Sequence, residues 1–204
     1  MQEISKELFK KQAEIEKQRI ELLKHCELPK WSRWTVDWGH LKIIEQSSNK
    51  NKWNQLEIYK QLLEKRTKPA IYCLSVNKGD GLSVFNKFKE AKKLHSTTRI
   101  KRGVSTAGFK NLSYLEKEYN GSCCVYVGSR KNDLHIRFKQ HLGYGSGRTG
   151  ALHLSKLYSE LERPPLIVFH YIILHEKYRS ITEKIEAVIQ KQLKPFIGKN
   201  LLGD

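Results

Sequence analysis

The sequence predicts an α/β (α+β) fold in which a small three-stranded mixed sheet is flanked by helices. The prediction rests on a change of pattern near residue 68. Before it, apolar residues recur at helical spacing, and after it short apolar runs typical of strands alternate with amphipathic segments. We therefore expect a helical N-terminal extension at 1–67 and a second domain at 68–204, with an insertion at 77–122 between its first two strands.

The extension begins with a predicted helix over residues 2–25, in which Leu8, Ile15 and Leu22 are seven residues apart. A coiled coil needs apolar residues at two positions of each seven-residue repeat, and polar residues occupy the second of these here. Two interpretations stay open: a helix packed on its own domain, or an arm that forms a homodimer. The segment carries six basic and five acidic side chains, so it is nearly neutral.

Two further segments complete the extension. Trp31, Trp34 and Trp38 form an aromatic loop that could stack on bases or anchor the connection to a core. Helical spacing of apolar residues predicts a second helix from Lys52 to Arg66.

Three apolar runs predict the strands of the second domain. They lie at Ala70–Val76, Cys123–Gly128 and Leu166–Leu174. Amphipathic segments predict helices near 82–94, 132–142, 151–161 and 180–193.

The charge of the chain points to a polyanionic partner. Lys and Arg number 38 against 21 Asp and Glu, which gives a net charge of +17 and a pI near 9.7. Nucleic acid or an anionic membrane surface is implied. Residues 84–139 alone hold 13 basic and 4 acidic side chains. Because no apolar run is long enough to cross a bilayer and the first residues lack an apolar signal core, we expect a cytoplasmic protein.

Two tyrosines on the first two predicted strands are candidate site residues. Tyr72 lies in AIYCL and Tyr126 in VYVGSR, each among apolar neighbours. A tyrosine on a strand is usually part of a core. The residues after Tyr126 favour a functional role, because Gly128 ends the strand and the cations Arg130 and Lys131 come next.

The next predicted helix adds two polar side chains at one edge of its apolar face. Arg137 and His141 are four residues apart, which places them about 40° apart around the helix axis. A guanidinium there could bind a phosphate with two hydrogen bonds, and the imidazole could contact the same group. The alternative is an ordinary charged surface.

The last predicted helix supplies a candidate metal ligand. Ser180 and Glu183 have the spacing of a capping box, which would explain Glu183. Glu186 instead falls at the edge of the apolar face. A carboxylate at such an edge suits Mg²⁺, which takes one or two carboxylates together with waters and phosphate oxygens.

Together these residues resemble the GIY-YIG endonuclease family. AIY at 70–72 is similar to its first motif, YVG at 126–128 to its second, and Arg137 with His141 to its Arg-x3-His helix. Glu186, followed by Pro195 and Asn200, is similar to its glutamate helix and the segment after it. The resemblance covers residues 68–200.

The resemblance implies a three-stranded sheet that hydrolyses phosphodiesters with one divalent cation, Mg²⁺ or Mn²⁺. By position, Tyr72 and Tyr126 would be the paired tyrosines and Arg137 the phosphate-stabilising residue, with His141 beside it. Glu186 would bind the metal and Asn200 would support the site. The sequence does not decide which of the two tyrosines is the general base, and we choose Tyr126 because it immediately precedes the cationic cluster.

The chain departs from the family pattern at three places. Ala70 replaces the first glycine, and Ser129 stands where some members have a lysine, which leaves Arg130 or Lys131 as substitutes. The interval from Pro195 to Asn200 is longer than the family's, so Asn200 is the least secure assignment.

DNA contacts are expected from the basic residues around this core. They are Lys92, Lys93, Lys101, Arg102, Arg130, Lys131 and Arg148. Arg148 lies in a stretch, Gly145–Gly150, that matches G-x-G-x-x-G but comes after a helix, so a flexible loop touching a phosphate is expected there rather than a dinucleotide site.

The sequence therefore predicts a metal-dependent DNA endonuclease of type II restriction character, because the catalytic region leaves no room for a separate reader domain. Two alternatives stay open. One is a nuclease of the same chemistry that acts on RNA or repair intermediates, and the other is a basic nucleic-acid-binding module without catalysis.

Overall fold

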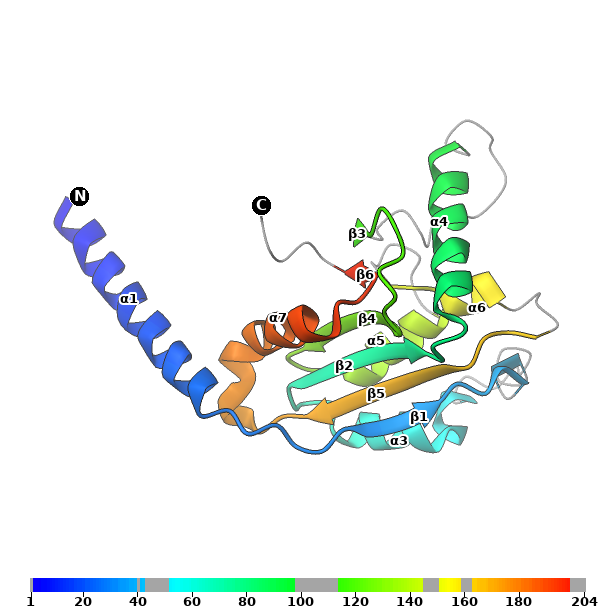
Figure 1. Cartoon of the computed structure of the whole chain (residues 1–204). Helices are drawn as coiled ribbons and strands as arrows, with labels where there is room; N and C mark the ends of the chain where they lie inside the picture. Colours follow the sequence, from blue (N-terminus) through cyan, green and yellow to red (C-terminus); the bar gives the residue numbers. More distant parts are fainter. Residues whose placement is uncertain are drawn as a thin grey trace.

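A computed structural model describes residues 2–39, 41–42, 52–97, 114–144, 151–158 and 163–198. Its centre is a mixed sheet with the strand order β1-β5-β2-β4-β6-β3 (Figure 1). The mixed α/β class expected from the sequence is thereby confirmed.

Three seven-residue strands form the middle of the sheet. They are β2 (Ala70–Val76), β4 (Cys124–Arg130) and β5 (Ile167–Ile173). Strand β2 pairs antiparallel with both of the others. All its side chains except Ser75 are buried, as the continuous apolar run predicts for a strand covered on both faces.

The predicted number of three strands was wrong, because short edge strands widen the sheet to six strands within the described part of the chain. These are β1 (Ser32–Thr35), β3 (Tyr114–Leu115) and β6 (Ile197–Gly198). Segments of two to four residues are too short to show the alternation that marks a strand in a sequence. Strand β6 pairs with β4 in parallel, whereas the other pairs are antiparallel.

Helices cover both faces of the sheet. Tyr72 and Leu74 of β2 share one core cluster with η1 (Lys52–Gln55), α3 (Glu57–Glu64), α5 (Leu134–Leu142) and α6 (Leu154–Tyr158). Ile71 and Cys73 share the other with η4 (Glu176–Ile181) and α7 (Thr182–Leu193). Alternate residues of one strand therefore face two different sets of helices.

The N-terminal helix α1 (Gln2–Lys24) projects away from the sheet (Figure 1). Its last turns contact the rest of the protein, where Leu22 and Leu23 pack against the apolar cluster that contains η4 and α7. Leu8 and Phe9 are 62% and 76% exposed. Strand β1 comes after this helix and pairs with β5, so residues before 68 add to the sheet. The division into domains at residue 67 stays a prediction.

The three tryptophans lie on a segment that packs on the body, as one of the two interpretations expected, but the expected loop was wrong at Trp34, which lies on strand β1. Trp34 lies edge-on against Phe138, at 5.4 Å between ring centroids. Trp38 packs on Tyr158, and its indole nitrogen donates a hydrogen bond to the Pro165 carbonyl at 3.1 Å.

Helix α4 (Gly81–Thr97) also stands out from the sheet (Figure 1). Val84, Phe85 and Phe88 at its base are buried in the core. It opens the predicted insertion, which the structure describes at 77–97 and 114–122.

The predicted capping box at Ser180 was wrong. Residues 176–181 form the separate turn η4, and α7 begins at Thr182 after Ile181, whose side chain makes no capping hydrogen bond. The Thr182 hydroxyl instead donates to the Tyr178 and Arg179 carbonyls. Glu183 is 73% exposed and pairs with Lys131 at 3.3 Å.

Among the described residues, no helix is both long and apolar enough to cross a membrane.

Candidate functional site

The paired tyrosines lie on neighbouring strands with a glycine between them. Tyr72 of β2 is opposite Gly128 of β4, and Tyr126 lies two residues before that glycine on the same face. The two rings are 6.0 Å apart between centroids. A Cβ atom on Gly128 would come within 2.4 Å of the Tyr72 hydroxyl and 2.7 Å of the Tyr126 ring. Only glycine leaves room for the Tyr72 ring to cross this strand.

The Tyr72 hydroxyl meets both predicted side chains of α5. His141 Nε2 lies 2.9 Å from it, and Arg137 Nε donates a hydrogen bond to it at 3.2 Å. The other ring nitrogen of His141, Nδ1, accepts from the Leu152 amide at 3.2 Å. Because Nδ1 accepts, a neutral His141 carries its proton on Nε2 and donates it to Tyr72.

These contacts fix the hydrogen bonding of Tyr72. Its oxygen accepts from both His141 and Arg137, which occupies its two acceptor positions. The hydroxyl proton is then left to donate. Tyr72 therefore orients the guanidinium while it remains a neutral phenol.

Burial dominates the protonation of this cluster. It raises the pKa of Tyr72 well above 10, with the neighbouring Tyr126 and Glu186 acting in the same direction and Arg137 opposing them. It also lowers the pKa of His141 well below 6.5, with the positive charge of Arg137 and the nearby His153 adding to the effect. At neutral pH both groups are uncharged.

Arg137 supplies the positive charge of the cluster. Burial works against its charged form, but interactions with Tyr72 and Tyr126 keep the pKa of the guanidinium above its ordinary value. It also donates to the Gln140 side chain at 3.3 Å. A fixed cation beside two tyrosines can bind a phosphate and stabilise negative charge that develops on it.

Glu186 lies on α7, which packs on the other face of the sheet from the tyrosines. Its side chain is buried, and the residue is only 4% exposed. Ser129 of β4 donates a hydrogen bond to one carboxylate oxygen, and Gln190 donates to the other at 3.0 Å. Gln190 also donates to the Val127 carbonyl at 3.2 Å, which ties the arrangement to β4.

This donor set suits a Mg²⁺ ion. The carboxylate of Glu186 presents hard oxygen atoms, and two hydrogen bonds hold it in one orientation. Among the described residues, no group of three or more His, Cys, Asp or Glu side chains could hold a metal. Glu186 with waters and substrate oxygens is the kind of coordination that Mg²⁺ accepts, whereas a structural zinc ion needs more protein ligands.

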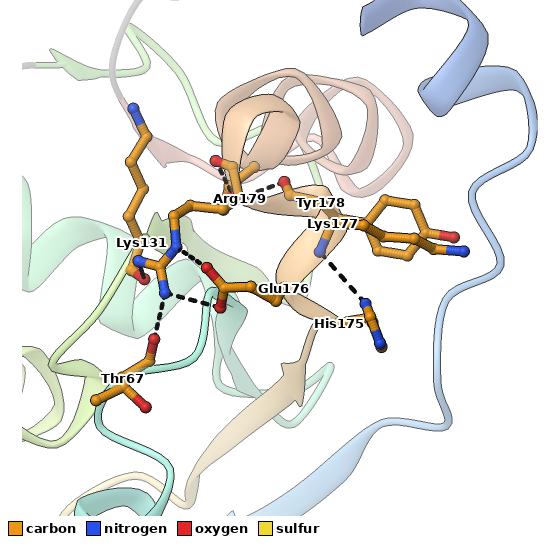
Figure 2. A network of polar contacts seen from close by, with 8 residues as sticks. Thr67, Lys131, His175, Glu176, Lys177, Tyr178 and Arg179 are labelled. Atoms are coloured by element: carbon orange, nitrogen blue, oxygen red, sulfur yellow. Dashed lines mark hydrogen bonds and ion pairs between the residues drawn. The ribbon is translucent and has the colours of Figure 1, made fainter.

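Arg179 holds together the loops from which these elements start. Figure 2 shows its guanidinium between the Thr67 and Lys131 carbonyls and the Glu176 carboxylate. Thr67 precedes β2, Lys131 comes after β4, and Glu176 opens the turn before α7. One side chain therefore links the entries to the strands and helices that carry Tyr72, Arg137 and Glu186.

The basic residues predicted to touch DNA lie in different places. Arg130 and Lys131 come at the end of β4 nearest Tyr72, where Arg130 donates to the Asn132 carbonyl at 3.3 Å. Lys92 and Lys93 are exposed on α4, which comes after the opposite end of β2. Four predicted residues fall outside the described part of the chain: Lys101, Arg102, Arg148 and Asn200.

Three supporting contacts of the site were not predicted from the sequence. Gln190 could have been found, because it is one turn after Glu186 and therefore on the same side of the helix. The Leu152 amide carries no side-chain signal, because its contact with His141 depends on how the chain returns after α5. The third contact is the hydrogen bond that Ser129 donates to Glu186.

Comparisons of the chain with protein-family models, curated proteins and solved structures found no match.

Replacement of Gly128 by alanine tests the close approach of the tyrosines. The new methyl group collides with the Tyr72 hydroxyl, so we expect a loss of about 1–3 kcal/mol in the free energy of unfolding. Gly79→Ala is the matched control, because nothing lies within 4 Å of the place its new Cβ atom would take. Urea unfolding measures both variants, and equal stability would contradict the geometry.

The buried His141 predicts a pH dependence of stability. Its pKa is lower in the folded than in the unfolded chain, so the unfolded state binds more protons as the pH falls below about 6.5. Stability is present above this pH and declines below it, by at most about 1.4 kcal/mol per pH unit from this group. In urea titrations at pH 5 to 8, His141→Gln should flatten the decline. The control is His25→Gln, because the His25 side chain is 82% exposed, and this variant should show the same decline in stability as the wild-type chain.

Proposed function

We propose that the chain is a divalent-metal-dependent endonuclease that hydrolyses DNA phosphodiester bonds by GIY-YIG-type chemistry. The observation that carries the proposal is the meeting of Tyr72, Arg137 and His141 at one hydroxyl group. A tyrosine that served only to fill a core needs one polar partner and no cation. A partly buried guanidinium beside two tyrosines adds little to packing and is useful where a phosphate must be held.

In this proposal Arg137 binds the scissile phosphate and stabilises the charge that develops on it. Tyr72, held by His141, positions the guanidinium. Tyr126 is the proposed general base, because the acceptor positions of Tyr72 are already filled. Its oxygen would take the proton of the attacking water while its own hydroxyl proton passes to an oxygen of the phosphate. Bound at Glu186, Mg²⁺ or Mn²⁺ would neutralise negative charge on the phosphate and leaving oxygens. Asn200 remains the proposed supporting residue, on the resemblance alone.

The charge of the chain supports DNA as the substrate. A net charge of +17 favours a polyanion, and the proposed contacts are Arg130 and Lys131 near the tyrosines, Lys92 and Lys93 on α4, with Lys101, Arg102 and Arg148. A restriction-type enzyme is the proposed subclass, and an RNA or repair-intermediate nuclease is the second candidate. Cleavage of matched duplex, single-stranded and branched substrates separates the two.

Glu186→Gln tests the metal assignment. The amide keeps the shape of the carboxylate but removes its charge, so we expect Mg²⁺-dependent cleavage to fall by at least about 100-fold while DNA binding stays within about twofold. Glu183→Gln, on the exposed side of the same helix, is the control and should cleave normally. If the Glu186 variant cleaves and the Glu183 variant does not, the metal lies elsewhere.

The salt dependence of DNA binding tests the basic surface. Replacement of Lys92, Lys93, Lys101 and Arg102 by alanine should weaken binding, and the slope of log K against log [salt] should fall by about 0.9 for each phosphate that is no longer neutralised. Lys60→Ala on α3 is a control for loss of an exposed charge. An unchanged slope in the quadruple variant would place the DNA on another surface.

We also propose that two copies act together on a duplex. One site hydrolyses one strand, and a twofold axis would present two sites to two antiparallel strands. Helix α1 is the proposed contact, because it projects from the body with Leu8 and Phe9 exposed and is nearly neutral in a basic chain.

Deletion of residues 1–25 tests this arrangement. The truncated chain should bind DNA as a monomer and accumulate nicked rather than linear plasmid. Light scattering of the DNA complex and gel analysis of the plasmid measure the two effects. A full-length monomer that linearises plasmid without a nicked intermediate would contradict the proposal.

A further inference from the structure

Helix α4 is the most prominent projection of the described residues after α1 (Figure 1). Its 17 residues correspond to about 25 Å of helix. Val84, Phe85 and Phe88 near its base are buried in the core, and Ala91 packs against the same core one turn later. The side turned away from these residues is exposed as far as Lys93.

The open side carries a particular set of polar groups. Asn86, Glu90 and Lys93 are exposed at spacings of four and three residues, which places them along one face. Val84 and Phe88 lie on the opposite face of the helix, in the core. An α-helix is therefore held at its base with an amide, a carboxylate and an ammonium group aligned away from the body.

The charge of α4 favours a polyanionic occupant. Residues 81–97 contain four lysines and one glutamate. A surface that bound only phosphates would gain from further cations in place of Asn86 and Glu90. Asparagine, glutamate and lysine are side chains that pair with the edges of adenine, cytosine and guanine in the major groove.

The size and location of α4 agree with that use. A helix about 10–12 Å across enters the major groove of B-form DNA, which is about 12 Å wide. Four residues of β2, or about 13 Å, separate Tyr72 from Val76, and α4 begins five residues later. The start of α4 therefore lies within one turn of B-form DNA, roughly 34 Å, of Tyr72.

We propose that α4 enters the major groove of B-form DNA and that Asn86, Glu90 and Lys93 read base edges there. The inference rests on the proposed function and makes it more specific, because the sequence left DNA and RNA both open. The major groove of A-form RNA is deep and narrow and does not admit side chains for reading. Duplex DNA is therefore the substrate class that α4 fits.

Selection of bound duplexes tests the inference without any cleavage. The full chain is mixed with random-sequence DNA duplexes in the absence of divalent metal, and the bound fraction is sequenced. The wild-type chain should enrich a consensus, and Asn86→Ala should lower the preference at one base pair by about fivefold or more. Lys93→Ala should do the same at a neighbouring pair. Asn54→Ala, another exposed asparagine in a short helix, is the matched control and should keep the wild-type consensus.

Three results would overturn the inference: no enriched sequence with the wild-type chain, an unchanged consensus in both α4 variants, or equal affinity for an RNA duplex of the selected sequence. A consensus that depends on α4 in a chain that never cleaves DNA with Mg²⁺ would support the inference and refute the proposed hydrolase. The two proposals can therefore fail separately.

Discussion

The hydroxyl group of Tyr72 is the point on which the geometry of the candidate site depends. It is buried, and a buried polar group without partners is costly. His141 and Arg137 meet that need from α5, and Leu152 fixes the imidazole that reaches it. Gly128 makes the arrangement possible, because any side chain there would occupy the same space. A change at one of these positions therefore disturbs the others.

The sheet separates the two halves of the site while also joining them. The tyrosines and α5 lie on one face and α7 on the other, yet Ser129 and Gln190 hold Glu186 against β4. A carboxylate buried in this way keeps one orientation, as a metal ligand should. Arg179 fixes two loops in a similar way, because it donates hydrogen bonds to the carbonyl of Thr67 before β2 and to the carbonyl of Lys131 after β4 (Figure 2).

The sequence predicted the central strands well, because β2, β4 and β5 are buried runs bounded by polar turns. Helical spacing predicted that Arg137 and His141 share one side of α5, whereas their grouping with Tyr72 was implied only by the family resemblance. The sequence missed β1, β3 and β6, whose few residues pair only through tertiary contacts. It misplaced the start of α7, because the Ser180 and Glu183 spacing suits a cap whereas the chain first forms the turn η4.

We propose that the cluster at Tyr72 orients Arg137 for phosphodiester hydrolysis. The most direct measurement is the rate at which Tyr72→Phe cleaves supercoiled plasmid at saturating Mg²⁺, relative to the wild-type chain. We predict wild-type cleavage that stops with EDTA and a rate at least about 100-fold lower in the variant, because a small displacement of a positioning group costs that much. Equal rates in a folded Tyr72→Phe chain, or no cleavage by the wild-type chain, would contradict it.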